Sequence, residues 1–146
     1  MNTIIIILGL PGSGKTTYAK TITTHKLYDD VLFNQYSKEL LDDINNINSI
    51  NIILTDPRFC DIDIFFKFLH KIGHITDNLQ NHLELIVFSN DLNQVRINLE
   101  QSETHHKISE LELMDFHHKY TKLLDSIEFK YTCKKLKTRY MNVYAS

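Results

Sequence analysis

The chain has 146 residues, of which 42% are hydrophobic and 23% charged, and this size and composition are typical of one globular domain. Its net charge of −2 excludes a general polyanion-binding protein, and its two cysteines lack the spacing of a metal site or a disulfide framework. Only four glycines and two prolines are present, which excludes collagen-like and low-complexity chains, and three of the glycines fall within six residues.

The first third of the chain begins with a strong strand pattern. Residues 3–8 form a continuous apolar, β-branched run, which is typical of a strand buried on both faces. The glycine-rich residues 9–14 follow, and the spacing then predicts a helix over 15–24. Residues 31–33 are the candidate second strand, and a helix is expected over 37–44 with Ser37 as its N-cap.

Strand and helix patterns continue to alternate along the rest of the chain. The further elements predicted are strands over 51–55 and 83–89, helices over 61–72, 91–99 and 109–124, and a final strand within 127–140. This alternation predicts an α/β fold in which helices cover both faces of a parallel sheet of four or five strands. No linker or repeat divides the sequence, so a single domain over 1–146 is expected.

The glycine-rich segment carries the most specific motif. Residues 9–16 read Gly-Leu-Pro-Gly-Ser-Gly-Lys-Thr and match the phosphate-binding pattern G-x-x-x-x-G-K-[ST], between a predicted strand and a predicted helix. Glycines let the backbone turn its amide N–H groups toward phosphate oxygens, Lys15 is expected to reach the β- and γ-phosphates, and Thr16 to bind Mg²⁺. The predicted nucleotide-binding residues are Gly9, Pro11, Gly12, Ser13, Gly14, Lys15, Thr16 and Thr17.

Other segments narrow the class of phosphate-loop protein. Guanine-nucleotide switches carry an N-K-x-D segment and transporter ATPases an L-S-G-G-Q-type segment, and the sequence contains neither. A compact chain with this loop so close to its start is more typical of a small kinase.

Three segments together resemble one family. The run IIIILGLPGSGKTTYAK, the strand and aspartate NIILTD, and Phe88 leading into a helix with Arg96 resemble the phage-type 5′-hydroxyl polynucleotide kinases and related small P-loop kinases, in the order of elements over most of residues 3–125. The resemblance implies that ATP, with Mg²⁺, donates its γ-phosphoryl group to a hydroxyl, commonly the 5′-OH of DNA or RNA. It also implies Lys15, Asp56 and Arg96 as catalytic residues and Thr16 and Asp56 as metal ligands.

The chain departs from the family after the second strand. There the family has a general-base aspartate flanked by an arginine, whereas this chain has Asn34. Two alternatives therefore stay open: a nucleoside, nucleotide or other small-molecule kinase, and a nucleotide-binding module without catalysis. Further candidates are Asp29, Asp30, Asp42 and Asp43 as substitutes for the base, Arg58 as an acceptor-phosphate contact, and His105 and His106 as lid donors.

The C-terminal part of the chain is locally basic. Residues 130–140 carry five positive charges interleaved with two tyrosines, namely Lys130, Lys134, Lys135, Lys137 and Arg139 with Tyr131 and Tyr140. Cations that follow a phosphate backbone, together with aromatic stacking platforms, are typical of single-stranded nucleic-acid binding. Such a strand is one predicted partner, and a solvated terminal element is the alternative.

The sequence also bears on location. No apolar run approaches the roughly 20 residues of a membrane span, and the first residues lack the basic start of a signal peptide. We therefore expect a cytoplasmic protein. The abundance of isoleucine and asparagine is typical of AT-rich genomes, including viral ones.

Overall fold

In a computed structural model of the chain, residues 2–32, 37–73, 79–101 and 108–143 are described. Their strands form one sheet in the order β2-β3-β1-β4-β5, and every neighbouring pair is parallel. The strands are β1 (Ile4–Leu8), β2 (Lys26–Asp29), β3 (Ile52–Thr55), β4 (Leu83–Phe88) and β5 (Lys137–Met141). The predicted α/β fold with a parallel sheet is confirmed.

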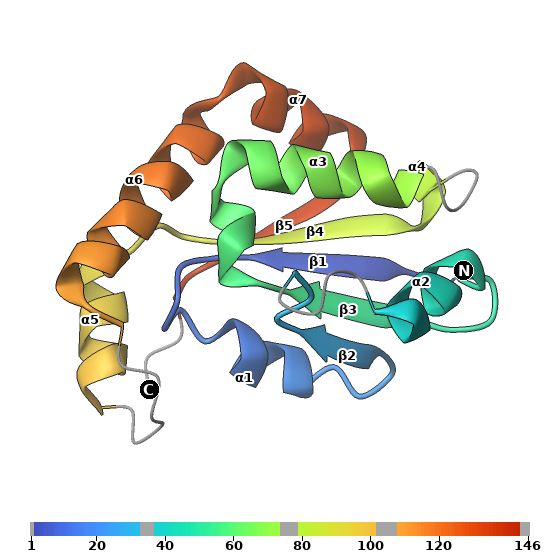
Figure 1. Cartoon of the computed structure of the whole chain (residues 1–146), viewed down its shortest axis with the longest axis horizontal. Helices are drawn as coiled ribbons and strands as arrows, with labels where there is room; N and C mark the ends of the chain where they lie inside the picture. Colours follow the sequence, from blue (N-terminus) through green and yellow to red (C-terminus); the bar gives the residue numbers. More distant parts are fainter. Residues whose placement is uncertain (1, 33–36, 74–78, 102–107, 144–146) are drawn as a thin grey trace.

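Helices pack on both faces of the sheet (Figure 1). They are α1 (Lys15–Lys20), α2 (Lys38–Asn45), the 3₁₀ helix η1 (Pro57–Cys60), α3 (Ile62–Gly73), α4 (Leu79–His82), α5 (Leu92–Gln101), α6 (Glu110–Asp125) and α7 (Ile127–Lys135). All five residues of β1 are buried, because alternate side chains join different cores. Ile4 and Ile6 belong to the large core that includes α3, α6 and α7, and Ile5 and Ile7 to the smaller core beneath α1.

The second strand lies earlier than the sequence predicts. It spans Lys26–Asp29 instead of 31–33, and Phe33 falls outside the described residues. Because β2 is an edge strand, all four of its residues are exposed or half-buried and the apolar signal in the sequence is weak. The first helix is also shorter than expected, since it ends at Lys20 and the chain turns through 21–25 into β2.

The predicted final strand is partly wrong. Residues 127–135 form helix α7, and only Lys137–Met141 continue as strand β5. The hydroxyl of Ser126 accepts a hydrogen bond from the Phe129 amide at 3.1 Å and so caps the helix. Phe129 is buried while Ile127 is 85% exposed, so the alternation of apolar residues around position 127 does not reflect a sheet face.

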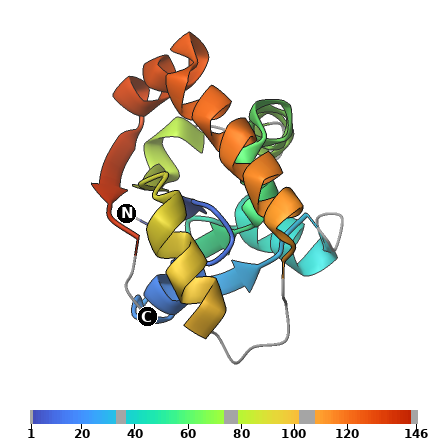
Figure 2. The same ribbon diagram turned by 90° about the vertical axis from the view of Figure 1, so that its left-hand side faces the viewer.

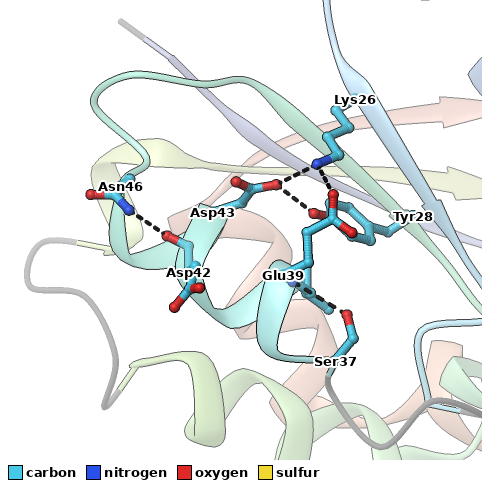
Figure 3. A network of polar contacts seen from close by, with 8 residues as sticks. Lys26, Tyr28, Ser37, Glu39, Asp42, Asp43 and Asn46 are labelled. Atoms are coloured by element: carbon cyan, nitrogen blue, oxygen red, sulfur yellow. Dashed lines mark hydrogen bonds and ion pairs between the residues drawn. The ribbon is translucent and has the colours of Figure 1, made fainter.

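A polar network joins α2 to β2 (Figure 3). The Asp43 carboxylate accepts hydrogen bonds from the hydroxyl of Tyr28 and from the ammonium of Lys26, the latter at 3.0 Å, and Lys26 also pairs with Glu39. Ser37 caps α2 as predicted, by accepting from the amide of Leu40 at 3.3 Å. The network fixes the edge strand, and therefore the position of the residues that follow Tyr28.

Replacing Asp43 with Asn is expected to change the pH dependence of stability. The Tyr28 hydrogen bond, followed by Lys26, holds the Asp43 pKa below its ordinary value of 3.8, so the carboxylate stabilises the folded state above that pH and less as the pH falls through the lowered pKa. Lys26 and Glu39 are 39% and 67% exposed, so solvent screens the network and we expect a loss of less than about 1 kcal/mol near neutral pH. Urea unfolding from pH 7 to pH 2 should show the two proteins converging at the acid end.

Asp42→Asn is the matched control, because Asp42 is exposed on the same helix. A constant difference between wild type and Asp43→Asn across the whole pH range would contradict the ionic origin of the effect.

Among the helices in the described ranges, none combines the length and the apolar character that crossing a bilayer requires.

Candidate functional site

The glycine-rich loop lies at the carboxyl end of β1, between Leu8 and the first residue of α1. In Figure 1 the strands run from right to left, so this loop lies on the left, near α5. Gly12 and Gly14 have φ angles of 81° and 89°, which L side chains rarely adopt. A Cβ atom on Gly12 would also lie 2.8 Å from the Leu99 side chain, so both the turn and the packing of the loop require glycine there.

Lys15 is buried within this loop, with 7% of its surface exposed. Its ammonium donates a hydrogen bond to the Leu10 carbonyl at 2.9 Å. Burial lowers the pKa of Lys15, and the negative charges of Asp29 and Asp56 act in the opposite direction. The hydroxyl of Ser13 is also buried and has no hydrogen-bond partner among the described residues. The loop therefore holds a buried cation and an unsatisfied hydroxyl, both suited to an anionic ligand.

Thr16 lies against the carboxylate of Asp29, a residue predicted to precede the second strand. Its hydroxyl donates to Asp29 Oδ2 at 3.3 Å, and the Thr55 hydroxyl donates to Asp29 Oδ1. Asp29 is the last residue of β2 and pairs in register with Thr55 of β3. A hydroxyl beside a carboxylate fits the oxygen ligands of Mg²⁺. Within the described ranges no group of three or more His, Cys, Asp or Glu is placed so that it could hold a metal ion.

Asp30 follows at the same edge of the site. Its φ of 50° is in the left-handed region, and its carboxylate accepts no hydrogen bond from any described residue. Burial raises the pKa of Asp30, with contributions from the negative charges of Asp29 and Asp56, while Arg58 and Lys15 oppose them. A carboxylate with a raised pKa and free lone pairs is suited to accept a proton.

Asp56 is fully buried at the end of β3 and caps η1. Its Oδ1 accepts from the Arg58 amide at 2.8 Å and from Arg58 Nε at 2.9 Å; its Oδ2 accepts from Arg58 Nη2 and from the Leu32 amide at 2.8 and 2.9 Å. These four bonds occupy both oxygens. Asp56 therefore ties the chain that follows Asp30 to the end of β3, and Arg58 is held in a bidentate pair.

Helix α5 contacts the loop through Asn98, which is not among the predicted site residues. Asn98 Nδ2 donates to the Gly12 carbonyl at 2.9 Å, and α5 lies in front of the sheet in the end-on view of Figure 2. Arg96, two residues earlier, is instead paired with Glu110 and lies 3.4 Å from Met114 Sδ, both on α6. Val95 and Asn98 are the buried residues of α5 and lie three positions apart, which places them on one face of the helix. This spacing was the only feature of the sequence that indicated which side of the helix faces the loop.

Buried side chains support the strand ends beneath the loop. The Cys60 thiol donates to the Gly9 carbonyl at 3.3 Å, and the Tyr120 hydroxyl donates to the carbonyls of Leu8 and Phe88 at 3.3 and 2.5 Å. Burial raises the pKa of Cys60 to about 12, so this thiol is a packing group and not a nucleophile.

The remaining predicted residues do not gather at the loop. Asn34, His105 and His106 lie outside the described residues. The basic residues of 130–140 lie on α7 and β5, and β5 is the edge strand opposite β2, which ends at Asp29.

Comparison with known proteins indicates the fold family. No family model matches the sequence. The uncharacterized protein R277 of Acanthamoeba polyphaga mimivirus is 28% identical over 116 residues, which are 77% of this chain and 80% of that protein.

Two solved structures resemble the chain over nearly its full length. A gluconokinase from Sinorhizobium meliloti superimposes with a TM-score of 0.58 at 10% identity, covering 99% of this chain and 84% of the other. A sugar kinase from Janibacter sp. gives 0.55 at 11% identity, covering 98% and 86%. At these identities the likeness establishes the fold alone, an α/β fold with a parallel sheet like those of these two kinases, as predicted.

Proposed function

We propose that this protein is an ATP- and Mg²⁺-dependent phosphotransferase that moves the γ-phosphoryl group to a hydroxyl. One observation carries the proposal. The buried loop lysine, Lys15, lies at the same end of the sheet as the acidic residues that follow two neighbouring strands, Asp29–Asp30 and Asp56. Crevices at the carboxyl ends of parallel strands are where α/β proteins bind ligands. The likeness to a gluconokinase and a sugar kinase supports the same reaction class.

The donor side consists of the loop. The Lys15 ammonium and the loop amides would neutralise the charge that develops on the transferred group. The Thr16 hydroxyl would hold Mg²⁺, with Asp29 beside it, and the ion would supply neutralisation of phosphate charge. Asn98 would keep the loop in shape by holding the Gly12 carbonyl. Arg96 remains proposed as a phosphate clamp, which requires it to leave Glu110.

The acceptor side is assigned to Asp30. Its carboxylate would accept the proton of the acceptor hydroxyl. In this role Asp30 would take the place of the general-base aspartate that the family has where this chain has Asn34. Asp56 would position this group, because its bond to the Leu32 amide anchors the chain two residues beyond Asp30. In this proposal the carboxylate beside the Thr16 hydroxyl is that of Asp29, instead of that of Asp56.

Two acceptor classes are proposed. The family resemblance favours the 5′-hydroxyl of a nucleic acid. Charge favours a small hydroxyl compound as the second candidate, because residues 26–63 contain eight Asp or Glu against three Lys or Arg, and a polyanion would be repelled by that surface.

Replacing Asp30 with Asn tests the assignment of the base. We expect a loss of about tenfold to a hundredfold in the rate of phosphoryl transfer, with ATP affinity little changed, because the carboxylate acts on the acceptor. The measurement is transfer of labelled γ-phosphate to 5′-hydroxyl oligonucleotides, nucleosides and sugars, alongside calorimetric titration with ATP.

Asp42→Asn is the matched control, since Asp42 is an exposed aspartate on the next helix. Transfer to oligonucleotides alone supports the first acceptor class, and transfer to nucleosides or sugars alone the second. Tight binding of ATP with no transfer to any acceptor would overturn the proposed function in favour of a nucleotide-binding module.

A further inference from the structure

A cavity lies between α7 and the edge strand β5, at the opposite edge of the sheet from β2, which ends at Asp29. It has a volume of about 400 Å³, within the range of small-ligand sites. Leu124 and Phe129 provide an apolar wall, and Lys130, Cys133 and Tyr140 line it together with residues from the end of β4. None of these residues takes part in the proposed phosphoryl transfer.

Of the two tyrosines predicted to stack on bases, Tyr140 lines this cavity and Tyr131 does not. The surface of Tyr140 is 70% exposed, so its ring is accessible to a ligand, and Cys133 lines the same cavity. Tyr131 differs, because the Lys135 ammonium lies 4.6 Å from its ring centroid and covers one face.

The cations of the basic segment also divide into two groups. Lys137 pairs with Glu84, and Arg139 donates to the Tyr18 hydroxyl at 3.3 Å, both on the side of the sheet that α1 covers. Lys130 and Lys134, one helical turn apart on α7, form no ion pair with any described residue. Lys130 lines the cavity, and Lys134 follows it on the same helix.

We propose that this cavity binds one nucleotide of a single-stranded nucleic acid, with the base against Tyr140 and the backbone phosphates at Lys130 and Lys134. A base offers an apolar face of the kind that an aromatic ring and Phe129 accommodate, and a phosphate is the natural partner of an unpaired lysine. Residues 127–141 contain five Lys or Arg against one Glu, so a polyanion is attracted here and repelled at 26–63. The site is independent of whether the protein transfers phosphate.

Binding of a labelled oligothymidylate of about fifteen nucleotides, near the upper end of single-strand site sizes, tests the proposal by fluorescence anisotropy. Tyr140→Ala is expected to weaken binding about tenfold and Tyr140→Phe to retain it, because the ring stacks. Lys130→Ala should weaken binding and lower the slope of log affinity against log salt by about one.

Tyr131→Ala and Lys137→Ala are the matched controls. The Tyr131 ring is covered on one face by Lys135, and Lys137 is paired with Glu84, so both variants should bind within about twofold of wild type. The proposal is overturned if wild type fails to bind the oligonucleotide, if these controls lose as much affinity as Tyr140→Ala, or if thymidine monophosphate binds as tightly as the strand. Phosphoryl transfer is not part of the readout, so its presence or absence leaves the result intact.

Discussion

Replacing Lys15 with Met is expected to lower the rate of phosphoryl transfer by about a thousandfold or more. The ammonium is buried in the loop and, with ATP bound, would face the charge that develops on the transferred phosphoryl group in a site of low dielectric constant. The methionine side chain is of similar length but carries no charge and no donor. Transfer of labelled γ-phosphate, measured with saturating ATP, gives the loss in rate.

The same substitution should leave the fold intact or make it more stable. Burial lowers the pKa of Lys15, which shows that the protonated form is poorly solvated in the folded chain, so removing the charge relieves a cost. We expect a thermal unfolding midpoint equal to or above that of wild type in the absence of ATP.

Lys20→Met is the control for both measurements, because Lys20 is exposed on the same helix. Transfer by Lys15→Met at the wild-type rate would refute the assignment of the loop as the donor site.

The interior of the sheet was predictable from sequence because β1, β3 and β4 are covered on both faces. Their side chains are apolar at nearly every position, and this signal survives without knowledge of the partner strands. The edge strand β2 has no such pattern, because Lys26 and Asp29 face solvent or a polar partner. The apolar run at 31–33 was therefore the stronger but misleading signal.

The C-terminal error has a different physical cause. Ile127, Phe129, Tyr131 and Cys133 alternate with polar residues, yet only Phe129 among them is fully buried. The capping hydroxyl of Ser126 and the packing of Phe129 against Phe65 of α3, with ring centroids 5.8 Å apart, favour a helix there. Tertiary packing outweighed a short local alternation.

The donor side of the site could be predicted because its residues are contiguous in sequence. The acceptor side could not, because it depends on register: Asp29 reaches Thr16 only since β2 pairs with β3 at Thr55. With the second strand predicted at 31–33, Asp29 and Asp30 precede that strand and Asn34 follows it. Asn98 was missed for a similar reason, since its contact with Gly12 spans 86 positions of the chain.

Replacing Asp56 with Ala is expected to destabilise the protein by about 3 kcal/mol, the lower end of the cost of breaking a buried ion pair. The variant leaves the Leu32 and Arg58 amides without their acceptor and removes the charge partner of the guanidinium. Arg58 has a side chain that is 38% exposed and can be rehydrated, which keeps the effect from being larger. Urea unfolding at pH 7 measures the change, with Asp42→Ala, at an exposed helix position, expected to stay within about 0.5 kcal/mol of wild type.

A double-mutant cycle separates the ion pair from the backbone bonds. Arg58→Met leaves a fully buried carboxylate without its charge partner, although the backbone amides at positions 32 and 58 still donate to it, so this variant should also be destabilised. Adding Arg58→Met to Asp56→Ala should then cost little more, because the guanidinium has already lost its partner, and the coupling between the two positions should exceed about 1 kcal/mol. Additive effects would mean that Asp56 acts through the backbone alone. In that case the chain beyond Asp30 would be held by the Leu32 amide, and Arg58→Met would leave phosphoryl transfer unchanged while Asp56→Ala would still reduce it.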